Sequence, residues 1–253
     1  MKIIASDYDG TLDYNGISQR VRDALVHWQS LGNKFGIVSG RGFQSILQIV
    51  RDEKVSCDFL IANNGAVIAD GNGQVLMAHK GCPDIVRDVA DFVIDNSCRY
   101  ACVSDTEGDL FLCCEAFKTT RYPDDKRYIL LDQYDREIAF TQISTVCRDS
   151  AAAESLTERL NKSFCGKITA LQNGRCIDIV PFGVNKARGI EDLLGFYDAS
   201  HDDVATVGDN KNDIAMLDAF RSYAVANAIE SIKEIAGAVV TDLAELVERE
   251  LEA

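Results

Sequence analysis

The chain opens with short, wholly apolar runs that alternate with longer amphipathic stretches. Three of these runs have the length of buried β-strands, namely residues 3–5, 35–38 and 59–62. Between the first two, apolar side chains recur at helical spacing from Val21 to Leu31, and Ser18 is placed to cap that helix. Strands that are joined through helices predict a parallel sheet covered on both faces.

The alternation breaks off at about residue 82 and resumes at about residue 182. The interrupting stretch mixes one helix at 83–96 with strand candidates, a second helix and a hairpin that turns at Asn173-Gly174. We therefore expect an α/β protein with two domains. Residues 1–81 and 182–253 would form a Rossmann-like, doubly wound parallel-sheet core, and residues 82–181 an inserted α+β domain.

Composition limits the partners of this protein. Among 253 residues, 40 acidic side chains face 26 basic ones, which gives a formal charge of −14. Such a balance argues against nucleic acid or an anionic membrane as the partner. No apolar run approaches the roughly 20 residues that span a bilayer, and no signal peptide is recognisable. We expect a cytoplasmic protein; the oligomeric state cannot be inferred from the sequence.

The nine cysteines do not form a recognisable metal-binding pattern. The closest grouping is Cys98, Cys102, Cys113 and Cys114, whose spacing differs from that of a zinc ribbon. In a chain without an export signal, cysteines are expected to be reduced and mostly buried.

Polar residues that suit chemistry follow the predicted core strands. Asp7 and Asp9 follow the first strand, Ser39 and Gly40 the second, and the segment 208–213 a fourth strand at 204–207. If the first strand extends to Asp9, both carboxylates point to the same side. Because parallel sheets bind ligands at the carboxyl ends of their strands, these groups are expected to meet at one edge.

Together these residues suit a metal ion and a phosphate group. Carboxylates crowded at one edge are costly without a cation, and a set rich in oxygen and free of sulfur favours Mg²⁺. Ser39 offers a hydroxyl and Gly40 an N–H for phosphate oxygens, while Lys186 offers a positive charge near a helix start. Each piece alone also has a structural explanation as a turn, a cap or a surface lysine. Their joint occurrence favours a site.

These motifs resemble those of the haloacid dehalogenase-like hydrolases, specifically the Cof-type sugar-phosphatase branch. Asp7-Tyr8-Asp9-Gly10-Thr11-Leu12 is similar to the first motif of the family, and Val38-Ser39-Gly40-Arg41 to the second, with Ser where many relatives have Thr. Lys186 matches the third motif and 208–213 the fourth. The pair Asn210-Lys211 departs from the family, where a small residue is common. The resemblance covers essentially the whole chain and identifies the inserted domain as a cap.

The resemblance implies a phosphatase that works through an aspartyl-phosphate. Asp7 would attack phosphorus, and Asp9 would protonate the leaving group and then activate water. Mg²⁺ would be held by the metal-binding set Asp7, Asp9 (through its carbonyl), Asp209 and Asp213 (through waters). Phosphoryl oxygens would be held by Ser39, Gly40 and Lys186, with Asn212 positioning Lys186 or the phosphate.

The substrate is expected to be a small phosphate monoester, with sugar phosphates as the leading class. Lys118, Arg121 and Arg127 in the inserted domain are candidates for reading the leaving group. Three alternatives stay open at this point: a phosphomutase of the same family, a signalling module that accepts phosphate on an aspartate, and a glycosyltransferase that binds metal through Asp-x-Asp. The large insertion argues against the second, and the Lys186 and Asp209 clusters argue against the third.

Overall fold

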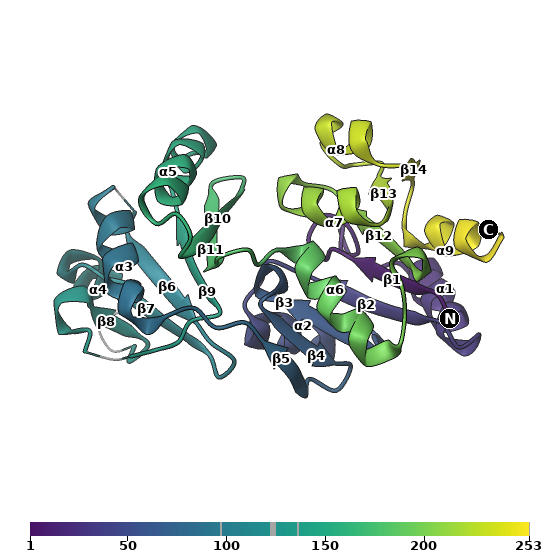
Figure 1. The fold of residues 1–253 in the computed structure, drawn as a ribbon, viewed down its shortest axis with the longest axis horizontal. Helices are drawn as coiled ribbons and strands as arrows, with labels where there is room; N and C mark the ends of the chain where they lie inside the picture. Colours follow the sequence, from purple (N-terminus) through teal and green to yellow (C-terminus); the bar gives the residue numbers. More distant parts are fainter. Residues whose placement is uncertain (97, 122–124, 136, 253) are drawn as a thin grey trace. The chain divides into compact units, whose positions relative to one another are not determined.

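The computed structural model describes residues 1–96, 98–121, 125–135 and 137–252. The chain divides into two compact units (Figure 1). The core unit comprises residues 1–41, 45–77 and 185–253, and the second unit comprises residues 42–44 and 78–184. The divisions at 77/78 and 184/185 lie a few residues outside the sequence-predicted boundaries at 81/82 and 181/182, which stay a prediction.

The core unit is built on an eight-stranded sheet in the order β14-β13-β12-β1-β2-β3-β4-β5. The parallel strands are β1 (Ile3–Ser6), β2 (Lys34–Val38), β3 (Phe59–Ala62), β12 (Val204–Gly208), β13 (Arg221–Val225) and β14 (Ala238–Val240). On the far side of β3, β4 (Val67–Asp70) pairs antiparallel and β5 (Val75–Ala78) completes the sheet. Because β1 lies between β2 and β12, the strand order reverses next to β1, and this reversal point is where such sheets bind ligands.

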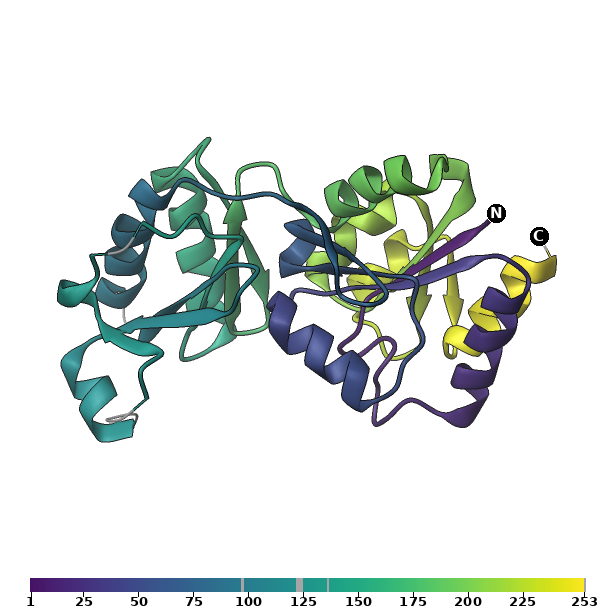
Figure 2. The same cartoon turned by 90° about the horizontal axis from the view of Figure 1, so that it is seen from below.

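Helices cover both faces of this sheet (Figure 2). One face carries α1 (Gln19–Ser30), α2 (Phe43–Asp52) and α9 (Leu243–Glu252), and the other carries α6 (Lys186–Tyr197). The remaining helical segments are η1 (Asn63–Gly65), η4 (His201–Asp203), η5 (Lys211–Asp213), α7 (Ile214–Ala219) and α8 (Glu230–Ile235). Ser18 caps α1 as predicted, since its Oγ accepts a hydrogen bond of 3.2 Å from the Val21 N–H. The predicted doubly wound core is confirmed.

The second unit has its own sheet, in the order β10-β11-β9-β6-β7-β8. Its strands are β6 (Tyr100–Ser104), β7 (Asp109–Cys113), β8 (Tyr128–Leu130), β9 (Gln142–Val146), β10 (Ile168–Asn173) and β11 (Cys176–Pro181). Its helical segments are η2 (Pro83–Ile85), α3 (Val86–Asp95), α4 (Glu115–Arg121), η3 (Leu131–Gln133) and α5 (Ser150–Ser163). Pairings are antiparallel except for β7 with β8, and a separate apolar core fills the unit. This is the predicted α+β insertion.

All nine cysteines are free thiols, and Cys98 and Cys147 bring their sulfur atoms within 3.7 Å. Within the part of the chain that the structure describes, no helix combines the length and the apolar character that crossing a bilayer requires.

Trp28 fastens α1 to the core sheet. Its side chain is fully buried, and its indole N–H donates a hydrogen bond of 2.8 Å to the carbonyl of Lys34 at the start of β2. The side chain therefore combines a large apolar contact with a buried polar group that is satisfied.

We expect Trp28→Ala to lower the free energy of unfolding by about 3–5 kcal/mol, because it opens a large cavity in the apolar core and removes the hydrogen bond from the indole to the Lys34 carbonyl. Urea titration followed by circular dichroism measures this, since Trp28 is the chain's single tryptophan and fluorescence would be lost. The matched control is Val26→Ala on the exposed side of the same helix, with a change within about 0.5 kcal/mol. Equal effects of the two substitutions would contradict this account of α1.

Candidate active site

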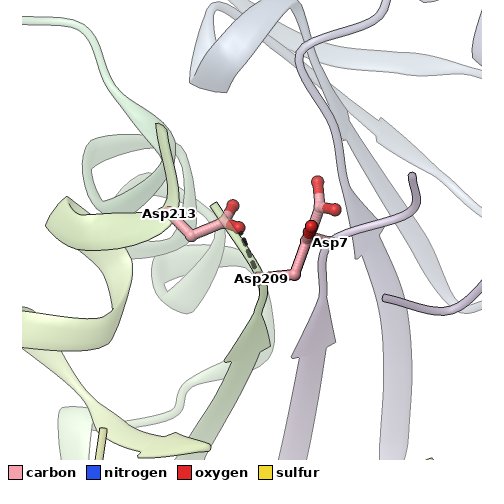
Figure 3. Close-up of side chains that lie close together, drawn as sticks. All are labelled: Asp7, Asp209 and Asp213. Carbon is pink, nitrogen blue, oxygen red and sulfur yellow. Dashed lines mark hydrogen bonds between the residues drawn. The ribbon is translucent and has the colours of Figure 1, made fainter. Parts of the chain in front are cut away.

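Neighbouring parallel strands bring Asp7 and Asp209 together. In the ladder between β1 and β12, Ser6 lies opposite Val207, and the Asp7 N–H donates to the Val207 carbonyl at 2.9 Å. Asp7 is the next residue after β1, and Asp209 is the next residue after β12. Carboxylates that are about 200 positions apart in sequence therefore share one edge of the sheet (Figure 3).

The turn after Asp7 is shaped around Asp209. Gly10 has φ +84°, and a Cβ at this position would lie 2.6 Å from Asp209 Oδ2. Thr11 Oγ1 donates to Asp209 Oδ1 at 3.0 Å, and the Asn227 side chain donates to the Gly10 carbonyl at 2.6 Å. Only glycine accommodates both the positive φ and the close approach of the carboxylate.

Asp213 is oriented by hydrogen bonds from its own loop. Its side chain is fully buried in η5, and Oδ2 accepts the N–H groups of Asp209 at 2.9 Å and Asn210 at 3.0 Å. Figure 3 shows the first of these bonds, with Asp7 facing the pair. Because both donors flank the Asp209 side chain, Asp213 also holds the loop that carries that side chain.

Lys186 supplies the positive charge of the cluster. Asn185 caps α6 by accepting the Arg188 N–H at 2.9 Å, which places Lys186 at the first helical position. The Lys186 ammonium is fully buried and donates to Asp7 Oδ1 at 2.5 Å and to Asp213 Oδ1 at 2.6 Å. Burial alone would lower the pKa of Lys186, but Asp213 and Asp7 raise it above its ordinary value, so the side chain stays charged.

One ammonium does not neutralise three carboxylates. Burial raises the pKa of Asp7 well above its ordinary value against the opposing effect of Lys186, and Asp213 adds to the rise. Burial, followed by the charge of Asp213, likewise raises the pKa of Asp209. One oxygen from each of Asp7, Asp209 and Asp213 lies within 4.8 Å of the others. The excess negative charge and the hard oxygen donors fit a divalent cation such as Mg²⁺.

Ser39 and Gly40 follow β2, which pairs with β1 on the side opposite β12. Ser39 is buried, and its Oγ accepts the Arg41 N–H at 3.1 Å, while its own N–H donates to the Ile61 carbonyl at 2.8 Å. The other predicted phosphate-binding residue, Asn212, lies partly exposed in η5. The phosphate-binding roles of these three residues stay predictions.

Asp9 behaves differently from Asp7. The strand ends at Ser6, so the condition under which both carboxylates would point to the same side is not met. Asp9 has a half-exposed side chain and forms a two-point ion pair with Arg41, with distances of 2.7 Å from Nε to Oδ2 and 2.6 Å from Nη2 to Oδ1. Its carboxylate does not belong to the cluster of Asp7, Asp209 and Asp213 among the described residues.

Sequence reasoning assigned no role to three residues that contact the candidate acids or the turn after Asp7. These are Thr11, Asn227 and Arg41. Of the three, Arg41 could best have been found from the sequence, because it is a cation that follows β2, the strand beside β1. Among the candidate substrate readers, Arg127 is exposed and paired with Asp125 at 2.8 Å. The Arg121 side chain lies outside the described residues, and Lys118 is in α4.

A doubly wound sheet with acidic groups at its reversal point defines a class of α/β enzymes that bind ligands at strand ends. The model of the haloacid dehalogenase-like hydrolase family matches residues 4–245, so the chain belongs to that family. The family predicted from the motifs is thereby confirmed, and the protein is a hydrolase.

Relatives and solved structures are similar to this chain over nearly its full length. The 5-amino-6-(5-phospho-D-ribitylamino)uracil phosphatase YbjI of Escherichia coli K12 is 24% identical over 242 residues, covering 90% of this chain and 86% of that protein. A haloacid dehalogenase-like hydrolase from B. subtilis has a TM-score of 0.82 at 22% identity, covering 98% of this chain and 99% of that one. The HAD subclass IIB sugar phosphatase BT4131 has a TM-score of 0.82 at 19% identity over 100% of both chains.

We expect Lys186→Met to lower the free energy of unfolding by about 3–5 kcal/mol at pH 7, because it leaves Asp7 and Asp213 buried without their cation. Urea unfolding in a chelating buffer measures the effect without metal. Lys162→Met, at an exposed position of α5, is the control and is expected to change stability by less than about 0.5 kcal/mol. A loss below about 1 kcal/mol for Lys186→Met would contradict the charge balance described here.

Proposed function

We propose that this hydrolase is a magnesium-dependent phosphatase that acts on small phosphate monoesters, with sugar phosphates as the expected class. The observation that carries the proposal is the meeting of Asp7, Asp209, Asp213 and Lys186 at the ends of β1 and β12. The phosphatase names of the E. coli relative and of BT4131 support the reaction class.

Asp7 is the proposed nucleophile. Lys186 binds one of its oxygens, which leaves the other oxygen for attack on phosphorus. A bond forms between that oxygen and phosphorus while the bond from phosphorus to the leaving oxygen breaks, and Asp9 gives a proton to the leaving oxygen. Water then attacks phosphorus and passes a proton to Asp9. The bond between phosphorus and the Asp7 oxygen breaks, which releases inorganic phosphate and restores the Asp7 carboxylate.

The remaining site residues would bind the metal ion and the negatively charged phosphoryl oxygens. Mg²⁺, when bound through Asp7, Asp209 and the Asp9 carbonyl with Asp213 behind its waters, would neutralise the phosphoryl oxygens. Lys186 donates two of its three N–H groups to Asp7 and Asp213, so the third N–H can donate to a phosphoryl oxygen. Because Ser39 Oγ accepts a backbone N–H, its hydroxyl proton can point to the phosphate.

The alternative within the family is a phosphomutase, which would keep the aspartyl-phosphate and return the phosphoryl group to a sugar. The same site chemistry serves both reactions, so product analysis decides between them. A colorimetric assay of inorganic phosphate over a panel of sugar phosphates gives release with a phosphatase and none with a mutase. It also identifies the preferred substrate.

We expect Asp7→Asn to reduce phosphate release by about 10³-fold or more, because a carboxamide cannot act as the nucleophile. Asp23→Asn is the matched control: Asp23 is exposed on α1, accepts a bond from Gln19 and lies outside the site. Circular dichroism verifies that both variants are folded. Turnover of Asp7→Asn at the wild-type rate would remove the nucleophile assignment.

Chelation is expected to abolish phosphate release, and added Mg²⁺ to restore it. Asp209→Asn should raise the Mg²⁺ concentration for half-maximal activity about 10–100-fold, since it removes one charge from the proposed metal-binding set. Titration with Mn²⁺ monitored by electron paramagnetic resonance measures binding independently of activity. Asp218→Asn, at an exposed position of α7, is the control. Full activity in excess chelator would refute the metal requirement.

A further inference from the structure

Arg41 holds the carboxylate of Asp9 at both oxygens. Nε and Nη2 of its guanidinium lie 2.7 and 2.6 Å from the two carboxylate oxygens, the paired geometry that a planar guanidinium makes possible. An arginine guanidinium stays protonated in proteins, so the cation is permanent. Both residues belong to the core unit.

The backbone and the guanidinium of Arg41 are themselves held by other parts of the candidate site. Its N–H donates to Ser39 Oγ at 3.1 Å, and its carbonyl accepts the Asn63 N–H at 2.9 Å. Its guanidinium carbon lies 5.9 Å from the ring centroid of Tyr8, the buried residue between the two acids. Arg41 therefore ties the end of β2 to the turn after β1.

Folding stability does not account for this arrangement. The two side chains are 41% and 49% exposed, and exposed ion pairs contribute little because water and salt screen them. An exposed pair is also opened at low cost. What the contact supplies is a defined orientation for a carboxylate that would otherwise turn freely about its side-chain torsions.

We propose that Arg41 is a positioning residue of the reaction, and that it acts by orienting Asp9 for proton exchange. The inference rests on the proposed function, because Asp9 exchanges a proton only if a phosphoryl group is transferred. In the first step the proton passes from an Asp9 oxygen to the leaving oxygen, and Arg41 holds the carboxylate that remains. In the second step the proton of the attacking water passes back to Asp9, one hydrogen bond to Arg41 opens, and the other keeps the group in place.

The alternative assignment is that Arg41 binds the substrate directly. A guanidinium at the end of β2 could contact a phosphate or a second anionic group of the substrate. The two assignments differ in the kinetic constant that they affect. Orientation of Asp9 acts on kcat, whereas direct contact with the substrate in the ground state acts on KM.

The test is a double-mutant cycle assayed with p-nitrophenyl phosphate. Because its leaving group needs little protonation, the cycle reports the second step, in which Asp9 takes the proton of the attacking water. We expect Arg41→Gln to lower kcat about 10–100-fold with KM within about threefold. Arg41→Lys is expected to recover part of the loss, since an ammonium cannot donate the paired bonds. In the Asp9→Asn background, Arg41→Gln should reduce kcat by less than about twofold, because its effect is transmitted through Asp9.

Arg22→Gln is the matched control. Arg22 also forms an exposed ion pair in the core unit, at 3.2 Å with Glu53, and it lies outside the site. Circular dichroism and urea midpoints verify that every variant folds. The proposal is overturned if Arg41→Gln keeps wild-type kcat, if it mainly raises KM, or if its effect persists in full in the Asp9→Asn background. Absence of metal-dependent phosphate release from the wild type would instead refute the proposed function, and this inference with it.

Discussion

A single buried ammonium group facing three carboxylates is the interaction on which the rest of the site depends. Lys186 bridges Asp7 and Asp213, which come from opposite ends of the chain, and burial makes each of these charges costly without the others. The bridge cancels one negative charge and leaves Asp209 in an acidic setting with a raised pKa. The same arrangement therefore fastens the strand ends to α6 and creates the excess charge that favours a divalent cation.

The topology of the sheet explains why these groups meet. β1 is central, with β2 on one side and β12 on the other, so residues that follow the three strands share one edge. Local features then set the distances: Gly10 lets the first turn pass close to Asp209, and Asp213 fastens the loop after β12. A phosphoryl group needs mainly positioning and neutralisation of charge, and both are supplied here by short loops on a rigid sheet.

The two acids of the first motif show how position controls chemistry. Asp7 and Asp9 are separated by one residue. The Asp7 side chain is 7% exposed and pairs with Lys186, whereas the Asp9 side chain is 49% exposed and pairs with Arg41. The chain leaves the strand after Ser6, and the turn that follows sends the second carboxylate to another partner. One acid is suited to attack on phosphorus within a charged cluster, and the other to proton exchange near water.

The sequence by itself determined the class of fold, since buried strands, helix caps and motifs at strand ends are local patterns. Each can be recognised within one segment without knowledge of its tertiary contacts. The sequence also determined that Asp7, Ser39, Lys186 and Asp209 follow strands or begin a helix. Only the tertiary structure decided which charges pair, because Lys186 with Asp213 and Arg41 with Asp9 are contacts between segments far apart in the chain. The tertiary structure likewise decided where β1 ends, since its pairing with β2 and β12 stops at Ser6. The pattern of residues along one strand does not show how far that strand pairs with its neighbours.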